Sequence, residues 1–126
     1  MLLRVLLWLN GLWDLACVAA MLYAARAREP WQAPHWALWE RSSDRANPAA
    51  RALFAALVLH WGGVRLLGAT RITEDGVRLC VMWTYAVESV FLSFAAATGG
   101  MREGRALVAS ALCVPMLILL LLHPRA

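Results

Sequence analysis

Apolar residues dominate four stretches of the chain, at about residues 2–25, 52–69, 79–98 and 105–123. Each stretch is long enough to cross a membrane as a helix, because about 20 apolar residues span the hydrocarbon core. The polar connection at 70–76 is short, and short connections place consecutive helices antiparallel. The pattern therefore predicts an all-α integral membrane protein, with four transmembrane helices in an up-down antiparallel bundle. We expect one transmembrane domain over 1–126.

The composition agrees with this prediction. Hydrophobic residues make up 62% of the 126 residues, whereas soluble domains are nearer ~45–50% apolar. The twelve basic residues are all arginine and lie mostly at the ends of the apolar stretches, where arginine anchors helices to lipid headgroups. No sustained basic stripe with interleaved aromatic residues is present, so we do not expect a nucleic-acid partner.

A longer polar segment at about 26–50 separates the first two stretches and contains Trp31, Trp36 and Trp39. Tryptophan prefers the membrane interface, where its ring is half in apolar surroundings and its N–H is in contact with water. The spacing predicts a short helix over 34–41 that lies on the membrane. We interpret the three tryptophans as interfacial anchors. The alternative is a lid or a surface that docks a partner.

One ionisable residue lies near the middle of each of the first three stretches, namely Asp14, His60 and Glu88. A charge at that depth costs ~2.5–3.5 kcal/mol, so such groups normally face a partner or a water-filled cavity. Their matched depth predicts one polar cluster at the midplane of the bundle. Arg65, near the end of the second stretch, is expected to extend toward the polar connection that follows.

This midplane cluster has three interpretations. The first is interhelical hydrogen bonding that orients the helices. The second is contact with a ligand. The third is an acid–base catalyst, which needs a carboxyl group beside an aromatic wall, and the sequence offers Trp13, Trp61 and Trp83 nearby. A proton relay would need a further partner, and the fourth stretch has no ionisable residue at mid-depth.

Metal and cofactor sites are not expected. Haem in a helical bundle often takes a pair of axial ligands, and His60 has no second histidine at matching depth. The cysteines all fall within apolar stretches and show no metal-ligand spacing, which is typical of structural cysteines. They are Cys17, Cys80 and Cys113.

Small residues and the fourth stretch indicate surfaces for association. Gly62 and Gly63 allow another helix to approach closely. The second half of the fourth stretch, PMLILLLL from Pro115 onward, is the most lipophilic part of the chain. We expect this helix to be the most exposed to lipid or to face an apolar partner.

Several residues of the second and third stretches follow a recognisable pattern. Arg51 opens the second stretch, Arg65 lies near its end, and the triplet Trp83-Thr84-Tyr85 follows in the third. In these positions the region 51–94 resembles the ergosterol-biosynthesis scaffold family, meaning ergosterol biosynthetic protein twenty-eight and its relatives. The resemblance covers about a third of the chain. It implies a small four-span protein that holds partner enzymes together in the endoplasmic reticulum membrane without catalysing a reaction itself.

We therefore expect a non-catalytic membrane scaffold or accessory structural subunit. Its partners would be lipids and other integral membrane proteins in a hetero-oligomeric complex. Its location would be the endoplasmic reticulum if the resemblance holds, and otherwise an organelle or a bacterial energy-transducing membrane. The alternative function is a small sterol- or lipid-binding protein, or an isomerase-like enzyme that uses Asp14, His60 and Glu88.

Overall fold

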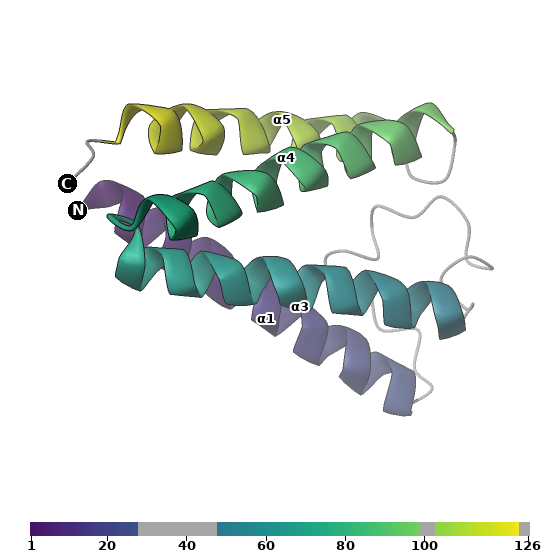
Figure 1. The fold of residues 1–126 in the computed structure, drawn as a ribbon. Coiled ribbons are helices and arrows are strands. Elements are labelled where there is room, and N and C mark those ends of the chain that lie inside the picture. Colours follow the sequence, from purple (N-terminus) through teal and green to yellow (C-terminus); the bar gives the residue numbers. More distant parts are fainter. Residues whose placement is uncertain (28–47, 99–102, 124–126) are drawn as a thin grey trace.

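Four α-helices make up the computed structural model, which describes residues 1–27, 48–98 and 103–123 and has no strand within them. The helices are α1 (Leu2–Ala27), α3 (Pro48–Arg71), α4 (Asp75–Ala97) and α5 (Glu103–Leu122). They alternate in direction, so the start of α1 and the end of α5 lie at the same end of the molecule (Figure 1). All four are long and apolar enough to cross a membrane. The predicted four-helix membrane bundle is confirmed, and the protein is an integral membrane protein.

The second and third helices begin earlier than the apolar pattern predicts. α3 begins at Pro48 rather than near 52, and α4 begins at Asp75 rather than near 79. Proline suits the first turn of a helix, as Pro48 does in α3. An acidic residue such as Asp75 in the first turn of α4 is stabilised by the positive end of the helix dipole. Only residues 72–74 remain for the turn, which the Glu74 N–H closes by donating to the Arg71 carbonyl at 3.0 Å.

The tryptophan-rich segment lies outside the described residues. The prediction of an interfacial helix over 34–41 and of three anchors therefore stays a prediction. The anchors are Trp31, Trp36 and Trp39.

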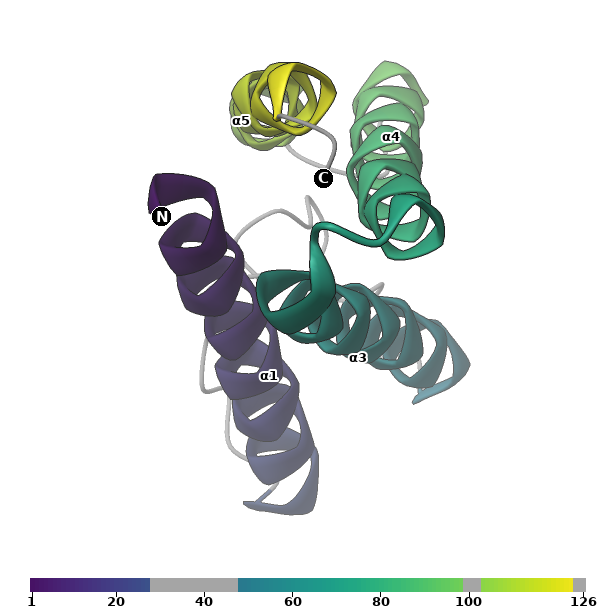
Figure 2. The ribbon, with the colours of Figure 1, turned by 60° about the vertical axis from the view of Figure 1, so that its left-hand side comes forward.

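The helices pack as two pairs, α1 with α3 and α4 with α5, and the tight turn joins the pairs (Figures 1 and 2). α1 meets α3 at Gly11 and Gly62. A Cβ on Gly11 would lie 2.9 Å from the Gly62 carbonyl oxygen, and one on Gly62 would lie 2.9 Å from Asp14 Cβ. Only glycine fits where two helix backbones approach this closely. The predicted close contact is confirmed for Gly62, whereas Gly63 has open space around its Cα and makes no such contact within the bundle.

Two apolar clusters fill the bundle on either side of its centre. One contains the rings of Phe54, Trp61 and Phe91, with the Phe91 centroid 6.2 Å from Phe54 and 6.4 Å from Trp61. The other lies toward the 72–74 turn and draws on all four helices. Its most enclosed members are Leu7, Val81 and Leu120.

α3 is the most enclosed of the four helices. It buries 44% of its membrane span inside the bundle, against 28% for both α4 and α5. The fourth apolar stretch was expected to be the most exposed to lipid, but α4 is as exposed as α5. α5 continues as a helix past Pro115, whose ring lies on the exposed side.

Candidate functional site

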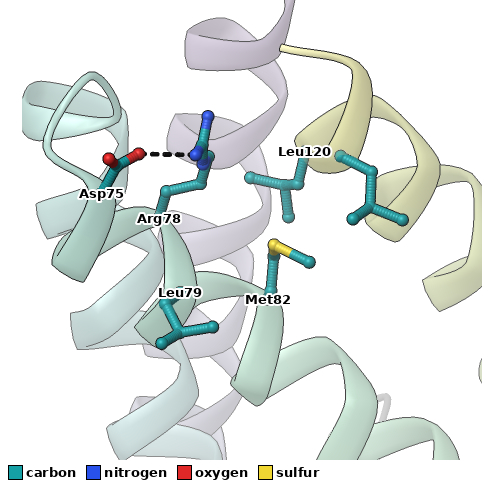
Figure 3. A pocket seen from close by; sticks show the side chains of 6 residues that line it. Asp75, Arg78, Leu79, Met82 and Leu120 are labelled. Carbon is teal, nitrogen blue, oxygen red and sulfur yellow. Dashed lines mark hydrogen bonds and ion pairs between the residues drawn. The ribbon is translucent and has the colours of Figure 1, made fainter. Parts of the chain in front are cut away.

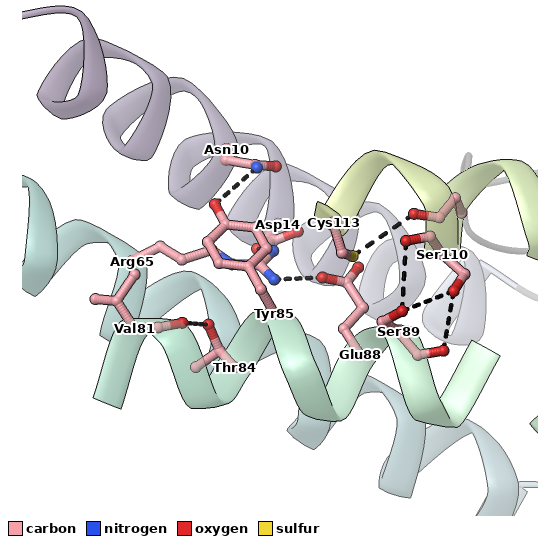
Figure 4. Close-up of polar contacts among 11 residues, drawn as sticks. Asn10, Asp14, Arg65, Val81, Thr84, Tyr85, Glu88, Ser89, Ser110 and Cys113 are labelled. Carbon is pink, nitrogen blue, oxygen red and sulfur yellow. Dashed lines mark hydrogen bonds and ion pairs between the residues drawn. The ribbon is translucent and has the colours of Figure 1, made fainter. Parts of the chain in front are cut away.

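A buried cluster of charged side chains joins three helices within the membrane span. Arg65 of α3 donates from Nη1 to Asp14 Oδ2 of α1 at 2.7 Å, and from Nη2 to Glu88 Oε2 of α4 (Figure 4). The side chains of Arg65 and Asp14 are 1% and 3% exposed, and that of Glu88 is 15% exposed. One planar guanidinium thus connects two carboxylates on different helices, which is a geometry that lysine cannot reproduce.

The backbone crossing of α1 and α3 makes room for this cluster. Asp14 lies against Gly62, where the missing side chain leaves space for the carboxylate. Arg65 is one helical turn beyond Gly62 on the same face of α3, so its long side chain reaches Asp14. Glu88 comes from the middle of α4 and meets the other end of the guanidinium.

Tyr85 covers the cluster from α4. Arg65 Cζ lies 4.0 Å from the centroid of the Tyr85 ring, a distance typical of a cation–π contact. Asn10 of α1 donates from Nδ2 to the Tyr85 hydroxyl at 2.9 Å (Figure 4). Within the part of the chain that the structure describes, Arg65 Nε is the one buried side-chain nitrogen or oxygen without a hydrogen-bond partner.

A second polar contact joins α4 to α5. Ser110 Oγ lies 2.8 Å from Ser89 Oγ and 2.9 Å from Ser93 Oγ, and it donates to the Ser89 carbonyl at 3.0 Å. Ser89 and Ser93 are four residues apart and so share one face of α4. The apolar pattern does not predict this cluster, although the four-residue spacing of Ser89 and Ser93 is a usable signal.

The end of the bundle near the 72–74 turn has its own hollow between α4 and α5, with a volume of about 380 Å³ (Figure 3). Its polar side holds Asp75 and Arg78, which contact each other at 2.6 Å. Arg78 also donates to the His123 carbonyl at 3.3 Å and so ties the start of α4 to the end of α5. Met82 and Leu120 form part of its apolar side.

A larger hollow lies over the outer face of α4, with a volume of about 630 Å³. His60 and Val64 border it from α3, Leu117 borders it from α5, and Trp83 and Ala86 belong to its lining on α4. Neither hollow is lined by Asp14, Arg65 or Glu88. Asp14 and Glu88 each bind Arg65, and these contacts account for the charged atoms without either hollow.

The structure corrects the predicted membership of the midplane cluster. Asp14 and Glu88 are brought together as predicted, but His60 is exposed and takes no part. Their partner is Arg65, which was wrongly expected to extend toward the connection after α3. Arg65 follows His60 by five positions, which turns their side chains about 140° apart at 3.6 residues per turn. His60 lies in the middle of its span as predicted, but its side chain points out of the bundle instead of into it.

The expected aromatic wall is also different. Trp61 is buried among apolar rings, whereas Trp13 and Trp83 are exposed on the lipid-facing side. Tyr85 supplies the ring beside the charges instead.

The residues that carry the family resemblance have different surroundings. Arg65, Thr84 and Tyr85 are buried, and Trp83 is exposed. Thr84 donates from Oγ1 to the Val81 carbonyl at 2.7 Å within its own helix. Arg51 lies in α3, and its side chain is outside what the structure describes.

Metal-ligating side chains do not gather within residues 1–27, 48–98 and 103–123, where no group of three or more histidine, cysteine, aspartate or glutamate residues could hold an ion. All three cysteines are free thiols. Cys17 and Cys113 are buried, whereas Cys80 is exposed at the larger hollow.

No family model, curated protein or solved structure matches the chain. The resemblance over residues 51–94 therefore stays a prediction.

Proposed function

We propose that the protein is a non-catalytic scaffold or accessory subunit that binds other integral membrane proteins. The observation that supports this proposal is that Asp14 and Glu88 both bind Arg65 in the core. Both carboxylates are held by one guanidinium, so they hold α1, α3 and α4 together and line neither hollow described above. The surfaces that remain for function are the outward-facing sides of the helices.

Those surfaces are apolar and carry several large rings. Trp8, Trp13, Trp83 and Phe94 all project outward. Helices in lipid associate through close packing and hydrogen bonds rather than through a hydrophobic driving force. If the family resemblance holds, the membrane is the endoplasmic reticulum and the partners are sterol-pathway enzymes. Otherwise the protein belongs to another organelle or to a bacterial energy-transducing membrane.

Mild-detergent purification of the full chain at its native level tests this proposal. We expect other integral membrane proteins to co-purify in stable proportion, and to be lost when the detergent is exchanged for a harsher one. Identification of those proteins by mass spectrometry would distinguish sterol-pathway enzymes from subunits of an energy-transducing complex. Purification of the chain with lipid alone would contradict the scaffold.

A second candidate function is the binding of a sterol or another apolar lipid. The observation that favours it is the 630 Å³ hollow, which has a strongly apolar lining and a single imidazole at its border. Ligand pockets of drug-sized molecules have similar volumes. A photoreactive sterol should then label Trp83 or its neighbours on α4, and unlabelled sterol should compete. The isomerase-like mechanism gains no support, because the carboxylates it would need line neither hollow described here.

A further inference from the structure

His60 presents a polar group on the lipid-facing side of the bundle. It lies near the middle of the α3 span, Ala52–Arg71, and its side chain is exposed. Among the described residues it has no hydrogen-bond or ion-pair partner. Hydrocarbon contains no water to satisfy an imidazole, and an unsatisfied polar group there costs several kcal/mol. This surface therefore requires a partner that offers a hydrogen bond at the same depth.

The residues around His60 allow a helix to come close. Gly63 is one turn away on the same exposed face of α3, and a Cβ built there meets nothing within 4 Å. Ala56 is one turn away in the other direction and is also exposed. Across the hollow, Trp83 of α4 is 67% exposed and projects outward. One surface thus carries a large protruding ring beside a flat helix face with small residues.

We infer that a second copy of this chain covers the surface formed by Ala56, His60, Gly63 and Trp83. In a two-fold interface the same patch on each copy meets the other, so it must be complementary to itself. A neutral imidazole meets this condition, because one nitrogen donates a hydrogen bond and the other accepts one. Two copies of His60 can therefore bind each other, whereas two arginines or two aspartates would repel.

Shape adds to this self-complementarity. The Trp83 ring of one copy can pack over Gly63 of the other, and the reciprocal contact follows from the two-fold axis. Small residues beside a hydrogen-bonding side chain are the usual means of helix association in membranes. The chain itself supplies both halves of each contact, the two imidazoles and the ring with the glycine. The inference goes beyond the proposed function, because self-association is independent of whether other proteins bind.

Reconstitution of the full chain in lipid bilayers at decreasing protein-to-lipid ratio tests the inference. The fraction of dimer is measured by single-molecule photobleaching of a fluorescent label. We expect a reversible dimer that His60→Leu weakens about 3- to 20-fold, the range spanned by interhelical hydrogen bonds. Gly63→Leu should weaken it by at least about 10-fold, because the new side chain holds the helices apart.

Two further variants separate the interface from general damage. His60→Gln should retain the dimer, because its amide also donates and accepts. Gly104→Leu is the matched control for Gly63→Leu, since Gly104 in α5 has equally open space and lies on another helix. Helical content by circular dichroism should be unchanged in all four variants.

Three results would overturn the inference. One is a monomer at every lipid ratio, and another is a dimer that neither His60→Leu nor Gly63→Leu weakens. The third is a monomer that retains a bound lipid, or another membrane protein, through His60. In that last case the second copy is wrong, while lipid binding or the scaffold proposal gains support. A homodimer that carries no other protein would contradict the scaffold and leave the second copy intact.

Discussion

Arg65 is almost completely enclosed by the bundle, and its two carboxylate partners explain how a membrane helix tolerates it. Removing one member of a buried ion pair leaves an uncompensated charge, which is more costly than replacing the whole group by apolar residues. Asp14 and Glu88 come from separate helices. Arg65 must therefore reach both carboxylates for the whole bundle to fold.

We predict that Arg65→Leu destabilises the protein by about 3–5 kcal/mol, since it leaves two buried carboxylates without a cation. Unfolding in mixed micelles with increasing denaturing detergent measures the change. Arg71→Leu is the matched control, because Arg71 is 62% exposed and lies 3.9 Å from Glu74. That control should change stability by less than about 1 kcal/mol.

The triple variant Asp14→Leu, Arg65→Leu and Glu88→Leu completes this test. Replacing a whole buried ion cluster by apolar residues of similar size is often neutral. Most of the stability lost in Arg65→Leu should therefore return. A triple variant as unstable as the single one would show that packing around Arg65, rather than its charge, holds the helices.

Tyr85 contributes through its hydroxyl and its ring, and the two can be separated. Tyr85→Phe keeps the ring 4.0 Å from Arg65 Cζ and removes the hydrogen bond from Asn10. We expect a loss of about 0.6–1.7 kcal/mol, the range for interhelical hydrogen bonds in membranes.

A double-mutant cycle in the same unfolding assay checks the Tyr85 prediction. Asn10→Ala should cost a similar amount, and the double variant Asn10→Ala with Tyr85→Phe should cost little more than either alone. Fully additive losses would show that Asn10 and Tyr85 do not interact.

Sequence patterns predicted part of the charged cluster at the residue scale. The central position of Asp14 and Glu88 in apolar stretches indicated groups that need partners, and both have one. The same reasoning selected His60 and placed Arg65 outside the core. Depth is visible in a sequence, but the direction of a side chain around a helix that is apolar on most sides is not. The serines of α4 and α5 were missed because single hydroxyls hardly alter an apolar pattern.

At the element scale, the pairing of α1 with α3 depends on one crossing point. Gly11 and Gly62 bring the two backbones together, and Asp14 occupies the space beside Gly62. Four apolar stretches sufficed to predict four helices, because a membrane span needs about 20 residues whatever its contacts. Which of two adjacent glycines faces a neighbour depends on helix rotation, so Gly62 and Gly63 could not be distinguished from the sequence.

These adjacent glycines provide a matched pair of substitutions. Gly62→Ala places a methyl group 2.9 Å from Asp14 Cβ, and such overpacking typically costs about 1–3 kcal/mol. Gly63→Ala meets no atom within 4 Å and should stabilise the helix by up to about 1 kcal/mol. Both are compared by detergent unfolding of dilute protein. Equal effects of the two substitutions would contradict the crossing described here.

At the scale of the whole molecule, burial of Arg65 increases the difference in the number of arginines between the two membrane surfaces. Arginines at the membrane surfaces favour the cytoplasmic side, and a buried arginine belongs to neither surface. With Arg65 removed from the count, the order of helices along the sequence assigns four arginines to the side of the 72–74 turn and seven to the opposite side. The four are Arg4, Arg71, Arg78 and Arg125; the seven are Arg26, Arg28, Arg41, Arg45, Arg51, Arg102 and Arg105.

We therefore predict that the segments 28–47 and 99–102 lie on the cytoplasmic side and the 72–74 turn on the opposite side. In a bacterial host, alkaline phosphatase fused after residue 126 should be active, and green fluorescent protein fused there should be dark, because α5 ends at Leu122 on the side of the turn (Figure 1). Arg41→Gln with Arg45→Gln leaves five arginines against four, so this double variant should yield a mixture of orientations. A fluorescent, phosphatase-inactive parent chain would show that another feature, such as the tryptophan-rich segment, sets the orientation instead.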